Sequence, residues 1–392
     1  MKNNYSTIID FGSTKLRLGV FDEKLNLSYS SSLDINENNN KDGYSESIKS
    51  IIKQAEKKIS NHLENITILY DTSEIFSVDL SIRKNFDQKI IVNDVYSSLI
   101  SEANQLIKNN YINKKIIHVI TITNIIDGKV ISKDINYNLK ANSIILDIKF
   151  ICLPIDKFNK ILNLFKLNNL QILNFYCSSY IKSFSYINSF NDNKFVAFLD
   201  IGWQRSTLTL FKNKKLNFIN SIPLGGNNIT KDISKVMKIE INESEKIKKA
   251  FNKSEIEFSY DQKINENNNS IIKEIIGKNI SIDLIKKVVL ARIEEIIELI
   301  FKELDFLKNT NEYKDTILVL TGNGSKLFNK NSFHFSDKYN FKEINFYEES
   351  DIEICSAGMS FRANLNNNNI NIVRKSLKKT GIFEKFFNFF SR

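Results

Sequence analysis

The chain has 392 residues, enough for two or three domains that each bury a core of their own. Hydrophobic residues make up 42% of it and charged residues 26%, which excludes a wholly disordered chain, and only 12 glycines and 2 prolines exclude a collagen-like or mucin-like one. No stretch reaches the roughly 18 uninterrupted apolar residues of a membrane-spanning helix, and no apolar signal segment follows Met1.

The cysteines indicate a reducing compartment. There are three of them, far apart and without a CxxC spacing, and the three histidines form no metal-binding spacing with them. We therefore expect a cytoplasmic protein.

The formal net charge of +10 indicates an anionic partner, either nucleic acid or an acidic membrane. Residues 370–392 hold six basic residues against one acidic residue, so half of the excess lies in this segment. The rest of the chain shows no interleaving of basic and aromatic residues. We expect a membrane surface and no nucleic acid.

Two segments far apart in the sequence predict the same hairpin. Residues 7–10 are typical of a strand that ends at Asp10, and a polar turn leads to alternating apolar residues. Residues 195–200 are typical of a strand that ends at Asp200, followed by the same alternation. Eleven positions separate Asp10 from Phe21, and eleven separate Asp200 from Phe211. This repeat predicts two related domains that face each other across a cleft.

The segments between the repeats predict a small mixed α/β insertion. It covers residues 90–111 and 116–153, with a helix over 95–107 and a strand over 116–122.

After the second hairpin, residues 229–251 predict a charged helix and residues 281–307 a long amphipathic one. A strand over 316–320 runs into a glycine-containing loop, and 366–369 is a polar linker.

Three loops have the composition of phosphate-binding turns. Gly, Ser and Thr expose N–H groups and hydroxyls to an anion, and hard cations prefer carboxylate oxygens. An ordinary hairpin turn is the simpler interpretation of any one loop, but three in this order favour a nucleotide cleft. The predicted ligands are Gly12, Ser13, Thr14 and Lys15 in the first loop; Asp10 and Asp200 for Mg2+ and its water; and Gly322, Asn323, Gly324 and Ser325 beside the adenine or α-phosphate.

These motifs, in this order, resemble the actin, hexokinase and Hsp70 superfamily, and more closely the bacterial cell-division family FtsA. Further segments similar to that family are 118–120, 125–128, 222–232, 244–248 and 357–358. The resemblance implies a two-lobed actin-like α/β fold, with duplicated ribonuclease-H-like subdomains around a cleft for ATP and Mg2+. It also implies nucleotide contacts from Gly202, Gly225, Gly226, Glu245 and Lys248.

The same resemblance implies a division of the chain into subdomains. Residues 1–74 and 169–194 form subdomain 1A, 75–168 the inserted subdomain 1C, 195–230 and 309–365 subdomain 2A, 231–308 subdomain 2B, 366–380 a linker, and 381–392 a membrane-targeting helix.

One departure from the family bears on the nucleotide. FtsA-like chains follow the second Asp-x-Gly with two small glycines and a threonine, where this chain has Trp203, Gln204 and Arg205. Glycine has no Cβ and lets the backbone approach a phosphate closely. The side chain of Trp203 at such a position can fill space that the phosphate needs. Arg205 can instead bind a phosphate directly. Both alternatives stay open at this point.

The last segment predicts an amphipathic helix. Drawn at about 100° per residue, its bulky apolar residues fall on one side and its polar residues on the other, a pattern typical of a helix that lies in a membrane interface. Docking on the protein's own core or on a partner is the alternative. The predicted membrane residues are Ile382, Phe383, Phe386, Phe387, Phe389 and Phe390, with Lys378, Lys379 and Lys385 facing anionic lipids.

The resemblance implies an actin homologue that binds ATP, assembles into filaments and tethers the FtsZ ring to the cytoplasmic side of the inner membrane at the division site. Its partners are then the FtsZ C-terminal peptide, other division proteins, anionic lipids and copies of itself, and it is at most a weak ATPase. Two alternatives remain: a nucleotide-free scaffold with a degenerate phosphate site, and a small-molecule kinase of the same superfamily.

Overall fold

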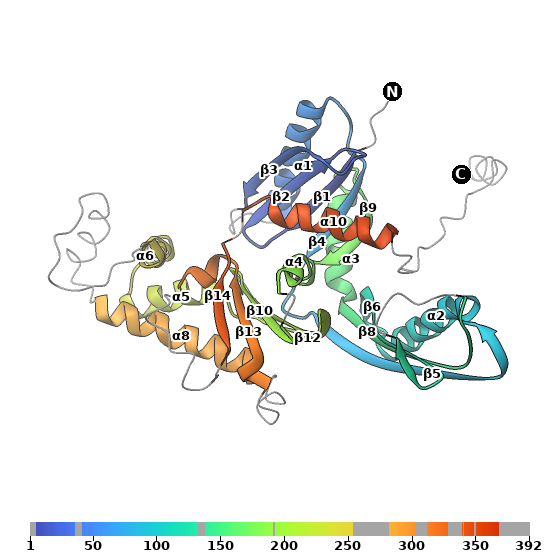
Figure 1. The fold of residues 1–392 in the computed structure, drawn as a ribbon. Helices are drawn as coiled ribbons and strands as arrows, with labels where there is room; N and C mark the ends of the chain where they lie inside the picture. The colour runs from blue at the N-terminus through green and yellow to red at the C-terminus, as the bar shows by residue number, and fades with distance from the viewer. Residues whose placement is uncertain are drawn as a thin grey trace.

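The structure is a computed structural model that describes residues 5–35, 41–131, 138–190, 193–253, 282–302, 312–327, 339, 341–348 and 350–367. Its strands form two sheets with helices around them, so the chain is a mixed α/β protein (Figure 1). The predicted α/β class is confirmed. None of the described helices is long and apolar enough to cross a membrane.

The first sheet has five strands in the order β3-β2-β1-β4-β9. The central strand β1 is antiparallel to β2 and parallel to β4, which is in turn parallel to β9. The carboxyl ends of β1, β4 and β9 therefore meet at one edge of the sheet. The bounds are β1 (Ser6–Phe11), β2 (Lys15–Phe21), β3 (Leu27–Asp34), β4 (Asn65–Tyr70) and β9 (Gln171–Cys177).

The second sheet has nine strands in the order β14-β13-β10-β11-β12-β5-β8-β6-β7. A single pairing of Asn220 with Phe76 joins its two halves. The bounds are β5 (Phe76–Ile91), β6 (Lys114–Ile126), β7 (Lys129–Ile131), β8 (Lys140–Pro154), β10 (Phe195–Ile201), β11 (Ser206–Lys212), β12 (Lys215–Ile222), β13 (Thr316–Thr321) and β14 (Glu343–Phe346).

The first sheet and one half of the second have the same topology, as the repeat predicts. In the first, β1 pairs with β2 so that Asp10 lies opposite Arg17; in the second, β10 pairs with β11 so that Asp200 lies opposite Thr207. Strand β4 lies parallel to β1 as β13 lies parallel to β10. The duplication predicted from residues 7–21 and 195–211 is confirmed.

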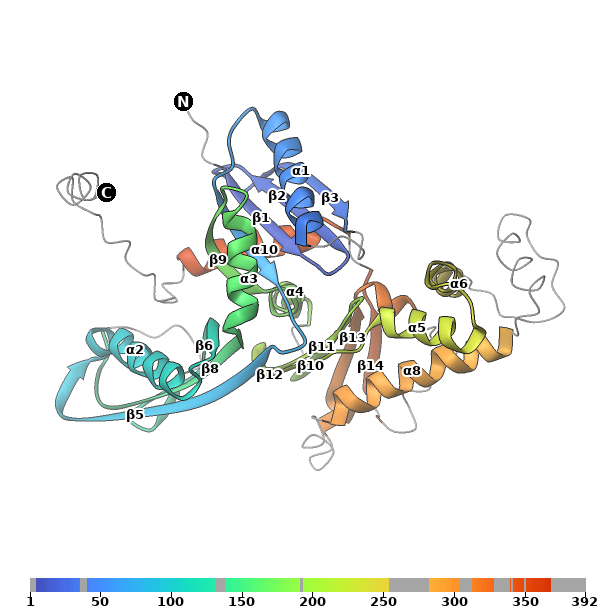
Figure 2. The ribbon, with the colours of Figure 1, turned by 180° about the vertical axis from the view of Figure 1, so that it is seen from behind.

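Helices cover both sheets (Figures 1 and 2). Helix α1 packs on β2 and β3 of the first sheet, while α10 packs on β1, β2 and α4 from the other face. In the second sheet, α8 packs on β11 and β12, and α2 packs on β5 and β8. The bounds are α1 (Lys41–Ile59), α2 (Val92–Asn110), α3 (Ile155–Lys166), α4 (Ser178–Tyr186), α5 (Gly226–Met237), α6 (Ile241–Lys253), α8 (Ile282–Lys302), α10 (Glu353–Asn367), and the short 3-10 helices η1 (Ile187–Ser189), η3 (Glu312–Asp315) and η4 (Asn323–Leu327).

The side chains of β10 point alternately to two different layers of the interior. Val196 and Phe198 point into the core shared with the first sheet, while Ala197 and Leu199 point into the core under α5 and α8. A strand with both faces buried reads as a continuous apolar run, as residues 195–199 do. Helix α4 contacts both β9 and β11, so it joins the two halves. We call the first sheet with α1, α3, α4 and α10 the first lobe, and β10–β14 with α5, α6 and α8 the second lobe.

Two predicted elements differ in the structure. The single helix expected over 229–251 is two helices, because Lys238 takes a left-handed conformation (φ 56°) that ends α5. Residues 366 and 367, expected in the polar linker, are the last two residues of α10, and the rest of the expected linker lies outside the described residues.

Other predictions are only partly testable. The helix expected over 281–307 is present as α8 up to Lys302, and the rest lies outside the described residues, as does the predicted membrane helix. The subdomain boundaries stay predictions. Ile161 and Phe165 of α3 belong to the core of the first lobe, which favours an end of the insertion before α3.

Candidate functional site

The two predicted phosphate loops have the same backbone geometry. The N–H of Gly12 donates to the carbonyl of Lys15 over 3.1 Å, and the N–H of Gly202 donates to the carbonyl of Arg205 over 2.9 Å. Each turn closes a hairpin at the edge of its lobe and places an aspartate, Asp10 or Asp200, two residues before the glycine. The sequence prediction of matching turns is confirmed.

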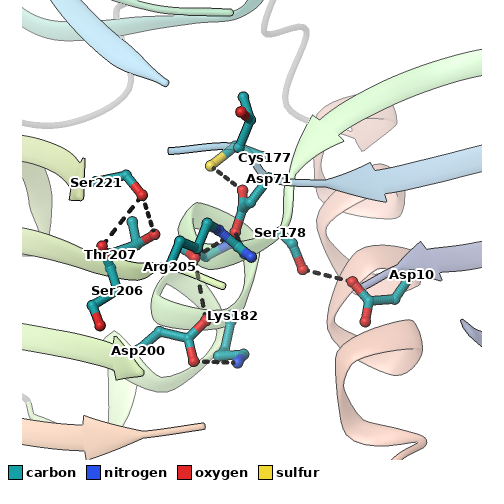
Figure 3. A network of polar contacts seen from close by, with 12 residues as sticks. Asp10, Asp71, Cys177, Ser178, Lys182, Asp200, Arg205, Ser206, Thr207 and Ser221 are labelled. Carbon is teal, nitrogen blue, oxygen red and sulfur yellow. Dashed lines mark hydrogen bonds and ion pairs between the residues drawn. The ribbon is translucent and has the colours of Figure 1, made fainter. Parts of the chain in front are cut away.

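Both aspartates are paired with cations. Figure 3 shows Asp200 beside Lys182, and Asp10 beside Ser178. Asp10 accepts hydrogen bonds from Arg17 Nη1 at 2.9 Å and from Ser178 Oγ at 2.7 Å. Asp200 forms an ion pair with Lys182 Nζ at 3.3 Å, and its carboxylate side chain is 13% exposed. Each carboxylate predicted to bind Mg2+ therefore has its charge balanced by a side chain of the protein.

A third carboxylate, Asp71, lies between them and was not predicted. It follows β4 at the edge where β1 and β9 also end, and its side chain is fully buried. It accepts hydrogen bonds from the N–H and hydroxyl of Ser179, from the Cys177 thiol and from Arg205 Nη2. Burial raises the pKa of Asp71, but the Arg205 charge and these hydrogen bonds hold it below its ordinary value.

Arg205 is the cation that the sequence left open as a phosphate ligand. Its guanidinium binds Asp71 of the other lobe, and its side chain is 17% exposed. Burial acts to lower the pKa of Arg205, but the negative charges of Asp71 and Asp200 outweigh it, so the pKa is raised above its ordinary value and the group stays charged. Its buried Nε has no hydrogen-bond partner among the described residues.

Lys15, the cation of the first loop, is also paired. Its Nζ lies 2.8 Å from a carboxylate oxygen of Asp351, which also accepts from Arg17 Nε and from Ser32. Burial acts to raise the pKa of Asp351, but these donors lower it to about 2. Asp351 precedes α10, so this cluster ties α10 to the first hairpin.

Helix α5 is packed directly against the second loop. The N–H groups of Gly226 and Asn227 donate to the carbonyls of Gly202 and Trp203 at 2.9 and 2.8 Å. A Cβ at Gly225 would lie 2.6 Å from the Gly202 carbonyl oxygen and 2.8 Å from the Arg205 nitrogen. Only glycine permits this approach, and the N–H groups with which a helix start binds anions are used within the chain.

Trp203 lies against α6. The Nζ of Lys248 is 4.3 Å from the Trp203 ring centroid, a cation–π contact. The same ammonium donates to the Gly226 carbonyl and to Thr230, and pairs with Glu245 at 2.7 Å. Glu245 and Lys248, predicted to contact the nucleotide, thus bind each other and the start of α5.

The third loop is packed onto β10. Gly322 has a φ of +82°, and a Cβ there would lie 2.3 Å from Asp200 Oδ1. A Cβ at Gly324 would lie 2.4 Å from Ile201 Cγ2, and Ser325 donates to the Gly322 carbonyl. The structure accounts for both glycines by contact with the neighbouring strand. Asn323 begins the short helix η4.

The side chains do not fit a magnesium–nucleotide complex in this arrangement. Mg2+ needs unpaired carboxylates, yet Asp10 and Asp200 are each paired with a cation. A phosphate needs cations and N–H groups, yet Lys15 and Arg205 bind carboxylates and the first N–H groups of α5 donate to backbone carbonyls. In the part of the chain that the structure describes, no three His, Cys, Asp or Glu side chains gather as a metal site.

The sequence offered one signal for Asp71. It follows an apolar strand segment, 66–70, as Asp10 and Asp200 follow theirs. No comparable signal marked Lys182, Arg17 or Asp351, because each is one charged residue among many.

Comparison with known proteins agrees with the resemblance seen in the sequence. Residues 197–337 match the family described as "Cell division protein FtsA". The chain is similar to FtsA. FtsA of Bacillus subtilis (strain 168) is 34% identical over 113 residues, which are 28% of this chain and 24% of that protein. The chain therefore matches about a quarter of the length of this curated relative.

One solved structure shares the fold over most of its length. A chain of the "PilM-PilN type IV pilus biogenesis complex" aligns over 90% of both chains with a TM-score of 0.59 at 11% identity. "MreB 5 of Spiroplasma citri bound to AMPPNP" aligns over 94% of this chain and 98% of that one, with a TM-score of 0.48 at 11% identity. The predicted actin-like two-lobed fold is confirmed.

Proposed function

We propose that this chain is an FtsA-like scaffold of cell division, an actin homologue that tethers a division-ring protein to the cytoplasmic side of the inner membrane. The match of residues 197–337 to FtsA carries this proposal. The actin-like fold agrees with it, because that fold can present one face to copies of itself and another to partners.

The proposal assigns a role to each part of the chain. Residues 231–308 receive the C-terminal peptide of FtsZ, the inserted subdomain built on α2 contacts other division proteins or the next copy, and the basic tail binds anionic lipids. One short amphipathic helix binds a membrane weakly and reversibly. Copies linked in a filament bind far more tightly, because the first bound tail raises the effective concentration of the others.

The geometry of the cleft favours the nucleotide-free version of this scaffold. Asp10, Asp200 and Asp71 are each balanced by a cation of the chain. The competing version, a filament switched by Mg-ATP with at most weak ATPase activity, requires these pairs to open. A small-molecule kinase is disfavoured by the same observation, since a general base needs an unpaired carboxylate within reach of its substrate.

Removing the tail tests the tether. We expect a chain that ends at Thr380 to remain in the supernatant with anionic liposomes, and the whole chain to pellet with them, with at least about a tenfold difference in bound fraction. The bulky apolar face supplies the insertion energy, so F383S/F386S in the whole chain, which keeps length and charge, should behave like the truncation. Full pelleting of the truncated chain contradicts the proposal.

A further inference from the structure

Two ion pairs of opposite polarity cross between the lobes. Asp71 of the first lobe binds Arg205 of the second, and Lys182 of the first lobe binds Asp200 of the second (Figure 3). Each lobe thus supplies one carboxylate and one cation. We call Asp71–Arg205 and Lys182–Asp200 the cross-lobe pairs.

Helix α4 holds both pairs in register. Its first turn carries Ser179, whose hydroxyl lies within hydrogen-bond distance of Asp71 and, at 3.3 Å, of Asp200. One turn later it carries Lys182, and Ser183 accepts a hydrogen bond from Thr209 of β11. Side chains three or four residues apart lie on one face of a helix. The contacts of α4 with the second lobe therefore include a polar row, Ser179, Lys182 and Ser183, beside apolar packing such as that of Tyr180 on Phe211.

We propose that the cross-lobe pairs join the two lobes in place of a bound magnesium–nucleotide complex, so that the closed arrangement is a fixed property of the chain. The inference deepens the nucleotide-free scaffold proposed above and rests on it for its meaning in cell division. Its test needs neither membrane nor partner, so it can fail while the tether proposal holds.

Two further observations support lobes that are joined permanently rather than only when a nucleotide is bound. The side chains of the pairs are little exposed, at 0% and 17% for Asp71 and Arg205 and 12% and 13% for Lys182 and Asp200. Water therefore screens them weakly, and breaking one pair leaves a charge that the surroundings cannot solvate. Helix α5 also holds the second loop in place, because two N–H groups at its start donate to carbonyls of that loop.

The protein also differs from a nucleotide-closed cleft in where its positive charge comes from. A metal ion bound between carboxylates would supply positive charge there only while it is bound. Here Arg205 and Lys182 carry that charge on the chain itself. Arg205 stays ionised at any pH that the protein meets, so this link does not depend on a ligand.

Hydrogen exchange of the whole protein tests the inference, with peptides that cover residues 65–75 and 198–206. We expect the same protection in both segments with and without millimolar Mg-ATP, within about twofold, because the lobes are already joined. R205Q should speed exchange in both segments at least about tenfold, since the buried carboxylate loses its partner. A clear slowing of exchange by Mg-ATP in the unaltered protein overturns the inference.

A matched control distinguishes the loss of a link between the lobes from the loss of any buried ion pair. Arg292 of α8 binds Asp232 of α5 through two hydrogen bonds, but both residues belong to the second lobe. R292Q should leave exchange at 65–75 and 198–206 as it is. If R205Q behaves like R292Q, the cross-lobe pairs do not hold the lobes together. If R205Q does not fold, the comparison with and without Mg-ATP still decides.

Discussion

Replacing Asp71 by asparagine is expected to lower the free energy of unfolding by about 3 kcal/mol. The substitution keeps the shape of the side chain but leaves the Arg205 charge buried opposite a neutral amide. Breaking a buried ion pair by removing one partner costs about 3–5 kcal/mol. We take the lower end because Asp200 also acts on Arg205 and raises its pKa.

Urea unfolding measures this effect, and two further variants show its origin. D232N breaks the pair of Asp232 with Arg292, whose side chains are 27% and 22% exposed, and should cost less than about 1 kcal/mol. The double variant D71N/R205Q removes both charges and should recover part of the loss, because no unpaired charge remains. A D71N protein no less stable than D232N would show that the buried Asp71–Arg205 pair contributes no more to stability than the more exposed Asp232–Arg292 pair.

The free energy of unfolding is expected to fall as the pH is lowered, because of proton binding at His118. This residue of β6 is buried, its Nε2 accepts the N–H of Cys177 at 2.8 Å, and Tyr176, Tyr180 and Phe361 surround its ring. Burial lowers the pKa of His118 from 6.5 to about 3, although the nearby Asp71 charge acts to raise it.

Proton binding sets the direction in which stability changes with pH. Between pH 6.5 and about 3 the unfolded chain binds a proton at His118 that the folded chain does not, so protons favour unfolding. The stabilisation is complete above pH 6.5 and is lost progressively as the pH falls, by about 1.4 kcal/mol per pH unit at this one residue. This loss reaches about 2–3 kcal/mol near pH 4.5.

Comparison with H118Q isolates the effect, because glutamine can accept the same N–H without titrating. Unfolding free energies measured from pH 7 to pH 4.5 should show a shallower slope in H118Q than in the unaltered protein. The control is H62Q, since the side chain of His62 is 89% exposed. Equal slopes in the unaltered protein and H118Q would mean that His118 is protonated in the folded state.

The sequence predicted the duplicated hairpins because the features that make them are local. Alternating apolar residues and a glycine two residues after an aspartate lie within fifteen positions of each other, and the register of β1–β2 and β10–β11 follows from them. The same holds for helix α2, whose apolar spacing is regular.

The sequence could not predict the pairing of the charges. Arg205 and Asp71 are 134 positions apart, and Lys15 and Asp351 are 336 apart. Such pairs arise only when the strand ends of two lobes meet, and a single sequence holds no signal for which of its 55 basic residues meets which of its 45 acidic residues. Trp203 is a similar case, because its contact with Lys248 depends on how α6 returns to the second loop.

A calorimetric titration of the whole protein with Mg-ATP shows whether this FtsA-like chain closes its cleft with its own charges. We expect no saturable heat of binding, because the cleft's charged side chains are already paired: Lys15 with Asp351, Arg205 with Asp71, Asp10 with Arg17 and Asp200 with Lys182. Saturable binding at micromolar concentration, a net free energy of about −8 kcal/mol, would contradict this expectation, because it would mean that the nucleotide displaces these pairs.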